Sequence, residues 1–208
     1  MPTPLVSLRH LERLTDDTGL LEHCLGKIPR RKEGYTTDDN ARALWVCLEW
    51  LELAKGSGNQ VFLDTLYRLA DRYLAFLLWV QREDGTFQNN ISFARLPEEE
   101  QPSDDCLGRS LWASAKSMVS FSDDGRRLAA EQIFALGLNA ARDLSFPRGW
   151  AYALAACSLL VRHGVDKTAI SKADIRKFVE QWEGKLVQAY SNASTNGWNW
   201  FEPAMTYG

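Results

Sequence analysis

The chain has 208 residues, of which 45% are hydrophobic and 25% are charged, and its formal net charge is -3 at pH 7; this composition is typical of a globular protein with a sizeable core. A slightly acidic chain with dispersed lysines and arginines lacks the basic field that nucleic acids and anionic membranes attract, and it contains no run of about 20 apolar residues. We therefore expect a cytoplasmic protein with no nucleic-acid partner and no membrane contact, and four cysteines without a C-x-x-C pair also favour a reducing compartment.

Helical periodicity runs through almost every long segment, because apolar residues recur at three- and four-residue steps. Phe62, Leu66, Leu69 and Tyr73 follow this spacing in one such segment. No segment alternates convincingly between apolar and polar residues as a strand would. The sequence therefore predicts an all-α fold. The expected helices cover, in chain order, 4–14, 36–55, 60–82, 104–121, 124–143, 147–163 and 171–190.

Three short breaks join these helices into antiparallel pairs. The breaks, at 56–59, 122–125 and 163–166, contain glycine with Ser, Asp or Asn, which end one helix and turn the chain into the next. The first helix of each pair is apolar on several faces and the second is more charged, so we expect an inner layer covered by an outer one. The predicted hairpins are 36–82, 104–143 and 147–190, after an N-terminal segment 1–35 and before the start of a further repeat at 196–208.

One motif occurs twice, at the beginning of the first two hairpins. Its copies are GYTTDDNARALW at 34–45 and SDDCLGRSLW at 103–112. In each copy a hydroxyl residue precedes two aspartates, an arginine follows, and Leu-Trp leads into an apolar helix. A duplicated helix start is typical of repeating α-hairpins, in which equivalent helix ends meet on one rim. We therefore expect the functional site on that rim.

The aspartates of the two motifs admit two interpretations. They are Asp38, Asp39, Asp104 and Asp105. Acid–base chemistry on a glycosidic bond needs one carboxylic acid and a second carboxylate, which such a rim can supply. Alternatively, Ser103 and Thr36 or Thr37 are N-caps, and the aspartates only favour the positive ends of the helix dipoles. In either case Arg42 and Arg109, three to five residues later, are placed to pair with these acids on the same helix face.

Aromatic residues provide a second candidate cluster. Trp198, Trp200 and Phe201 can stack on the C–H face of a sugar ring, while Glu202 grips hydroxyls or acts as a general acid; packing in the core is the alternative. Tyr35 either directs its hydroxyl into the same pocket or packs at the helix start. We assign the tryptophans inside predicted helices to packing. These are Trp45, Trp79 and Trp112.

Five segments of the chain match a known pattern. They are LTDDTG at 14–19, GYTTDDNARAL at 34–44, DGTFQNN at 84–90, SDDCLGRSLW at 103–112 and WNWFEPAMTYG at 198–208. Together they resemble the six-hairpin, (α/α)6-toroid glycosidase-like domains of bacterial carbohydrate-active proteins, which often stand beside glycosyltransferases. The resemblance implies that the acidic rim lines a sugar pocket. Because this superfamily includes hydrolases, lyases, epimerases and non-catalytic members, it does not fix the activity.

The resemblance also implies that the chain is an incomplete ring. A complete toroid has six hairpins, whereas three are predicted here within one partial domain, 1–208, that corresponds to the N-terminal half. The first hairpin would then lack its sixth neighbour and leave apolar flanks uncovered. We expect either self-association or a separate C-terminal half that closes the toroid.

The sequence thus predicts a carbohydrate-active domain that binds an oligosaccharide or other glycan and performs glycosidase-like acid–base chemistry. The alternative is a non-catalytic module that binds glycan or scaffolds a glycosyltransferase. No metal and no cofactor is expected, since the histidines lack metal-ligand spacing and no phosphate-binding glycine loop is present. The predicted catalytic residues are Asp38, Asp39 and Glu202. The predicted substrate-binding residues are Tyr35, Arg42, Asp104, Asp105, Arg109, Trp198 and Trp200.

Overall fold

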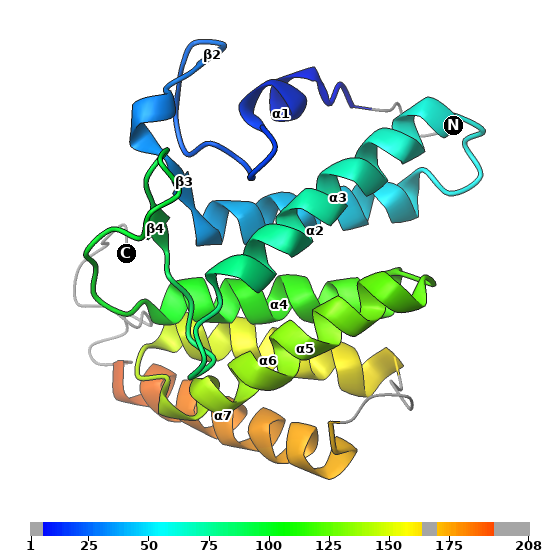
Figure 1. Ribbon diagram of the computed structural model, residues 1–208. Coiled ribbons are helices and arrows are strands. Elements are labelled where there is room, and N and C mark those ends of the chain that lie inside the picture. The colour runs from blue at the N-terminus through cyan, green and yellow to red at the C-terminus, as the bar shows by residue number, and fades with distance from the viewer. Residues whose placement is uncertain (1–5, 164–169, 194–208) are drawn as a thin grey trace.

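The computed structural model describes residues 6–163 and 170–193, and this part of the chain is mostly helical (Figure 1). The α-helices are α1 (Arg9–Leu14), α2 (Thr37–Leu53), α3 (Gln60–Val80), α4 (Asp104–Ser120), α5 (Asp124–Ala140), α6 (Pro147–His163) and α7 (Lys172–Ala193). Two 3-10 turns cover Arg31–Glu33 and Ala141–Asp143. The predicted all-α class is confirmed, and α2 to α7 lie within a few residues of their expected bounds. Within the described residues, no helix is both long and apolar enough to cross a membrane.

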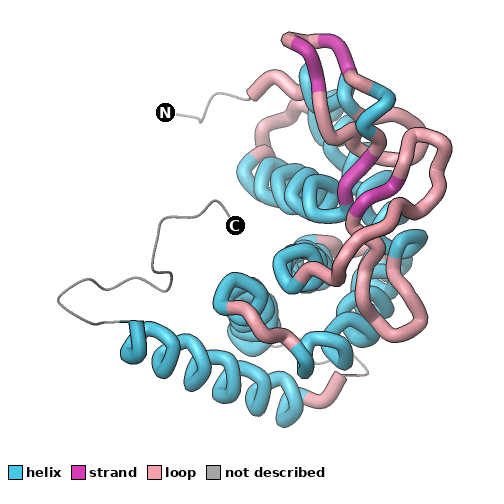
Figure 2. The backbone as a smooth tube through the Cα atoms, turned by 90° about the vertical axis from the view of Figure 1, so that its left-hand side faces the viewer, coloured by secondary structure: helices cyan, strands magenta, loops and turns pink. Residues whose placement is uncertain are grey.

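The six long helices form three hairpins that stack one after another, from α2 and α3 at the top of Figure 1 to α6 and α7 at the bottom. Helices α2, α4 and α6 lie side by side in one layer, and each also packs against the second helix of its own hairpin. Figure 2 shows the strands and most connecting loops gathered on one side of the helices. The alternation of inner and outer helices therefore brings the starts of α2, α4 and α6 together.

Small residues let the inner helices approach one another closely. A Cβ atom added to Gly108 of α4 would lie 2.9 Å from Tyr152 Cβ and 3.1 Å from the Gly149 carbonyl oxygen of α6. A Cβ added to Gly149 would in turn lie 2.8 Å from Asp104 Cβ. Backbone packing at this distance fixes the register of α4 against α6, which places the side chains at their first turns.

The core lies between the two layers. Leu44 and Leu48 of α2, Leu69 and Tyr73 of α3, and Leu111 of α4 are fully buried there. Apolar burial on this scale is the main source of stability of a helical hairpin stack. The buried thiols are those of Cys47, Cys106 and Cys157, which are free cysteines. Burial raises the pKa of Cys47 and Cys157 to about 12, as expected for thiols that pack as small hydrophobes.

Short strands modify the expected helical picture. Strand β1 (Cys24–Leu25) pairs with β2 (Ile28–Pro29), and β3 (Tyr35–Thr36) pairs with β4 (Asn90–Ile91), both antiparallel. The prediction of no strand was wrong here, because two residues are too few for an alternating pattern. The β3–β4 pair ties the long connection between the first two hairpins to the start of α2, where the Thr37 N–H also donates to the Asn89 carbonyl at 2.9 Å.

Candidate functional site

The starts of the inner helices carry the predicted acids. Ser103 caps α4, since its Oγ accepts a hydrogen bond from Cys106 N at 3.2 Å, as the sequence predicted. Thr36 occupies the N-cap position of α2 but caps no backbone N–H; its hydroxyl instead donates to Asp39 Oδ2 at 2.8 Å. The acids at the two helix starts are therefore held in different ways.

A chain of ion pairs joins the three inner helices. Arg109 of α4 contacts Asp38 of α2 at 2.5 Å through Nη1 and Asp105 of its own helix at 2.9 Å through Nη2. Arg148 of α6 approaches the same Asp105 carboxylate at 3.5 Å. Arg42 pairs with Asp38 at 3.4 Å and also with Asp39. The predicted pairing of each arginine with the acids of its own helix is confirmed, and Arg109 additionally crosses to α2.

Burial sets the electrostatics of this network. It raises the pKa of Asp105, and this effect outweighs the Arg109 and Arg148 cations, which act in the opposite direction. Burial also acts to lower the pKa of Arg109, but the Tyr152 hydroxyl and the nearby carboxylates raise it by more, so the guanidinium stays charged. Asp105 Oδ1 and Arg109 Nε are both buried and have no hydrogen-bond partner among the described residues. The network thus contains one unused acceptor and one unused donor.

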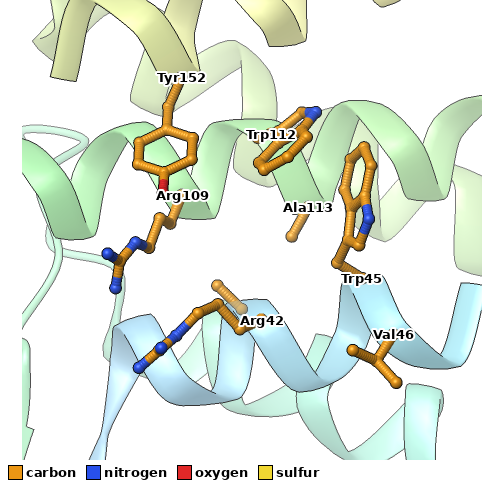
Figure 3. Close-up of a pocket in the computed structure, with 8 residues that line it drawn as sticks. Arg42, Trp45, Val46, Arg109, Trp112, Ala113 and Tyr152 are labelled. Carbon is orange, nitrogen blue, oxygen red and sulfur yellow. The ribbon is translucent and has the colours of Figure 1, made fainter. Parts of the chain in front are cut away.

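An aromatic cavity of about 210 Å³ adjoins these ion pairs (Figure 3). Trp45 and Trp112 form its wall with ring centroids 3.9 Å apart, and Tyr152 of α6 lies 5.3 Å from Trp112. The guanidinium groups of Arg42 and Arg109 lie at one end, where Arg109 is 5.4 Å from the centre of the Tyr152 ring. The cavity therefore has flat apolar walls and a charged end.

Sequence reasoning assigned Trp45 and Trp112 to packing alone. They do pack against each other, but they also line the cavity. Each stands three residues after an arginine of the network, one helical turn away on the same face. That spacing was present in the duplicated motif and could have identified both rings.

A buried lysine of α4 packs against Trp45, one of the rings that line the aromatic cavity. Lys116 Nζ contacts Glu49 at 2.8 Å and Glu52 at 3.0 Å, both on α2, and lies 5.5 Å from the centre of the Trp45 ring. Although burial acts to lower its pKa, the two carboxylates raise it, so Lys116 stays charged. This second link between α4 and α2 was not predicted from the sequence, since Lys116 lies more than 60 residues from its two glutamate partners.

The structure separates two of the predicted binding residues from the aromatic cavity. Tyr35 is 1% exposed, and its hydroxyl donates to Asp16 at 2.7 Å, so it ties the N-terminal segment to the start of α2. Burial and this hydrogen bond raise its pKa to about 12. Asp104 Oδ2 accepts from the N–H groups of Ser145 at 2.6 Å and Phe146 at 2.8 Å, which fixes the loop before α6.

The remaining predicted residues group as follows. Asp38, Asp39, Arg42, Asp105 and Arg109 come together at the starts of α2 and α4. Trp198, Trp200 and Glu202, with Phe201, lie outside the described residues. Among the residues that the structure does describe, no three His, Cys, Asp or Glu side chains are grouped to hold a metal ion.

Comparisons of the chain with protein-family models, with curated proteins and with solved structures gave no match. A charged network set beside flat aromatic walls is suited to a ligand with both polar and apolar surfaces.

The two carboxylates that share Arg109 should respond differently to neutralisation. Because the pKa of Asp105 is raised in the folded state, its protonated form contributes stability that is fully present below its ordinary pKa of 3.8 and is lost as the pH rises through the raised value. Asp105→Asn, which mimics the protonated form, should therefore leave the free energy of unfolding at pH 7 within about 0.5 kcal/mol of wild type or raise it. Asp38→Asn should lower it by about 1–2 kcal/mol, because it loses a charge-assisted hydrogen bond to Arg109.

Urea unfolding of both variants at pH 7 and pH 4 measures this difference. The gain of Asp105→Asn relative to wild type should shrink toward pH 4. Equal losses for the two variants at pH 7 would contradict the assignment.

Proposed function

We propose that this chain is a carbohydrate-binding domain whose cleft lies at the starts of α2, α4 and α6. The observation that carries the proposal is the direct continuation of an aromatic wall, Trp45, Trp112 and Tyr152, into a rim of alternating carboxylates and guanidinium groups. A pyranose presents a C–H face that stacks on aromatic rings and an edge of hydroxyls that both donate and accept hydrogen bonds.

The charges at the rim favour an uncharged sugar. Three carboxylates, Asp38, Asp39 and Asp105, are matched there by three guanidinium groups. The three guanidinium groups are those of Arg42, Arg109 and Arg148. Sugar hydroxyls can donate to the carboxylate oxygens of this rim and accept from its guanidinium N–H groups.

The arrangement of the helices supports a partial (α/α)6 toroid. Three hairpins stack in sequence with their inner helices adjacent, and the duplicated motif lies at equivalent positions on the first two of them. In such a fold the inner-helix starts face a central cleft. The ring would be closed by a C-terminal half or by a second copy of this chain.

One observation favours catalysis at this site as a second candidate function. The raised pKa of Asp105 favours a protonated carboxyl group, which is the property of a general acid, and Asp38 is the nearby second carboxylate on the same guanidinium. The sequence placed the chemistry on Asp38 and Asp39 with Glu202. Asp105 is added here as a candidate proton donor, because burial disfavours its ionised form.

Replacing Trp112 tests the binding proposal. Trp112→Ala removes the central ring of the aromatic wall and should weaken sugar binding about tenfold or more, which is the loss of a stacking contact plus its buried area. Trp112→Phe keeps an aromatic ring and should lose less of the sugar affinity. Ligand-observed NMR against a panel of mono- and oligosaccharides is the measurement, and circular dichroism checks that each variant is folded.

Trp79→Ala is the matched control. Trp79 is a partly exposed tryptophan on the outer helix α3 that does not line the aromatic cavity, and its loss should leave sugar binding there unchanged. Equal sugar binding by the Trp112→Ala and wild-type proteins would overturn the proposal. Retained binding with lost glycoside turnover in Asp105→Asn would select the catalytic function over binding alone.

A further inference from the structure

A second hollow lies at the starts of α4 and α6, one helical turn before residues that line the aromatic cavity. It has a volume of about 330 Å³ and lies between the starts of α4 and α6, where Asp105, Arg148 and Phe146 line it. Its residues belong to the same two inner helices and to the loops that lead into them. The second copy of the duplicated motif contributes Ser103, Asp104 and Asp105 to it, whereas Phe146 lies outside both copies.

The two hollows are linked through the ion-pair network. Asp105 lines the second hollow and binds Arg109, which lines the aromatic cavity. Likewise, Arg148 lines the second hollow one turn before Tyr152 of the aromatic cavity. The lining residues of the two hollows are thus offset by one helical turn, about 5.4 Å, along both helices. This offset is similar to the length of one pyranose unit.

Phe146 is held in place without contributing its ring to the core. Its side chain is 68% exposed. Its N–H donates to Asp104 at 2.8 Å, and its carbonyl accepts from Trp150 N at 3.2 Å. A rigid backbone therefore presents a large aromatic ring to solvent beside a carboxylate and a guanidinium. The aromatic cavity contains the same combination, since flat rings lie next to charged groups there as well.

We propose that the second hollow is an adjoining sugar subsite, so that the ligand is an oligosaccharide of at least two units. One unit stacks on Trp112 in the aromatic cavity, the next stacks on Phe146, and the linkage between them passes Asp105. This inference rests on the proposed function, and it adds the size of the ligand and the direction in which it extends.

The dependence of affinity on ligand length tests the inference. The probes are glucose, cellobiose and cellotriose, together with mannose and its β-1,4-linked di- and trisaccharides, titrated by ligand-observed NMR. In the wild-type protein the disaccharide of the preferred series should bind about tenfold tighter than its monosaccharide, as expected for a second stacking contact. Phe146→Ala should remove this gain and leave the affinity for the monosaccharide unchanged.

Leu128→Ala is the control for loss of an exposed apolar side chain. Leu128 is 66% exposed on α5, in the outer layer, so its replacement should preserve the affinity for both ligand lengths. Equal wild-type affinities for mono- and disaccharide, or a length dependence that survives Phe146→Ala, would overturn the subsite while leaving the proposed function intact. The proposed function itself would be overturned if no probe bound, or if Trp112→Ala bound the sugars as tightly as wild type.

Discussion

Arg109→Ala is expected to lower the free energy of unfolding by about 2–4 kcal/mol, because it removes the largely buried cation that two carboxylates share at close range. The Arg109 side chain is only 13% exposed and holds both Asp38 and Asp105. Without its charge these carboxylates repel each other and lose their link between α2 and α4. We expect sugar binding to be lost as well, since Arg109 also forms the charged end of the aromatic cavity.

Urea unfolding and ligand-observed NMR measure the two effects. Arg127→Ala is the matched control, because Arg127 pairs with the exposed Asp124 on an outer helix and should cost less than about 0.5 kcal/mol. Arg109→Lys should recover only part of the stability, since an ammonium group keeps the charge but lacks the fork that bridges two carboxylates. A loss for Arg109→Ala no larger than that for Arg127→Ala would refute the role of the network.

Gly34→Ala is expected to destabilise the protein by about 3 kcal/mol or more, from a positive-φ backbone together with a severe clash. Gly34 has a φ of 73°, and a Cβ atom there would lie 2.1 Å from the Ile91 carbonyl oxygen. Relief of this clash would separate β3 from β4 just before the first turn of α2. The shift should also weaken sugar binding, because Asp38 and Asp39 begin that helix.

Gly26→Ala separates the two causes. Gly26 has a similar φ of 61°, but nothing lies within 4 Å of its added Cβ atom. Gly26→Ala should therefore lower the free energy of unfolding only by the strain of a positive φ, about 1 kcal/mol. Thermal unfolding of both variants gives the comparison, and equal melting temperatures would show that the β3–β4 contact does not constrain the start of α2.

The sequence was most predictive where the information is local. The expected helices 104–121 and 147–163 match α4 and α6 closely, because capping residues, glycine breaks and apolar periodicity all act within a few residues. The duplicated motif also predicted that equivalent helix starts meet. The Arg109–Asp38 pair, which joins the two copies, is in line with that prediction.

What the sequence could not predict depends on the register between helices. Whether Arg109 pairs only within α4 or also reaches Asp38 depends on how α2 lies against α4. Tyr35 illustrates the same limit, because pairing of β3 with β4 places its ring in the core, whereas its position in the motif favoured the pocket equally. Trp200 and Glu202, which lie outside the described residues, stay predictions.

The glycine contact between α4 and α6 has a consequence for how fast a ligand can exchange. Because Gly108 and Gly149 meet backbone to backbone, these helices have no room to slide past each other without a clash. Any adjustment around a bound ligand would therefore fall to exposed side chains such as Arg148, which pairs with Asp105 and whose rotation takes picoseconds to nanoseconds, rather than to helix movements of microseconds to milliseconds. Association of the proposed ligand would then be governed by diffusion and orientation, and differences in affinity between ligands would reside in their dissociation rates.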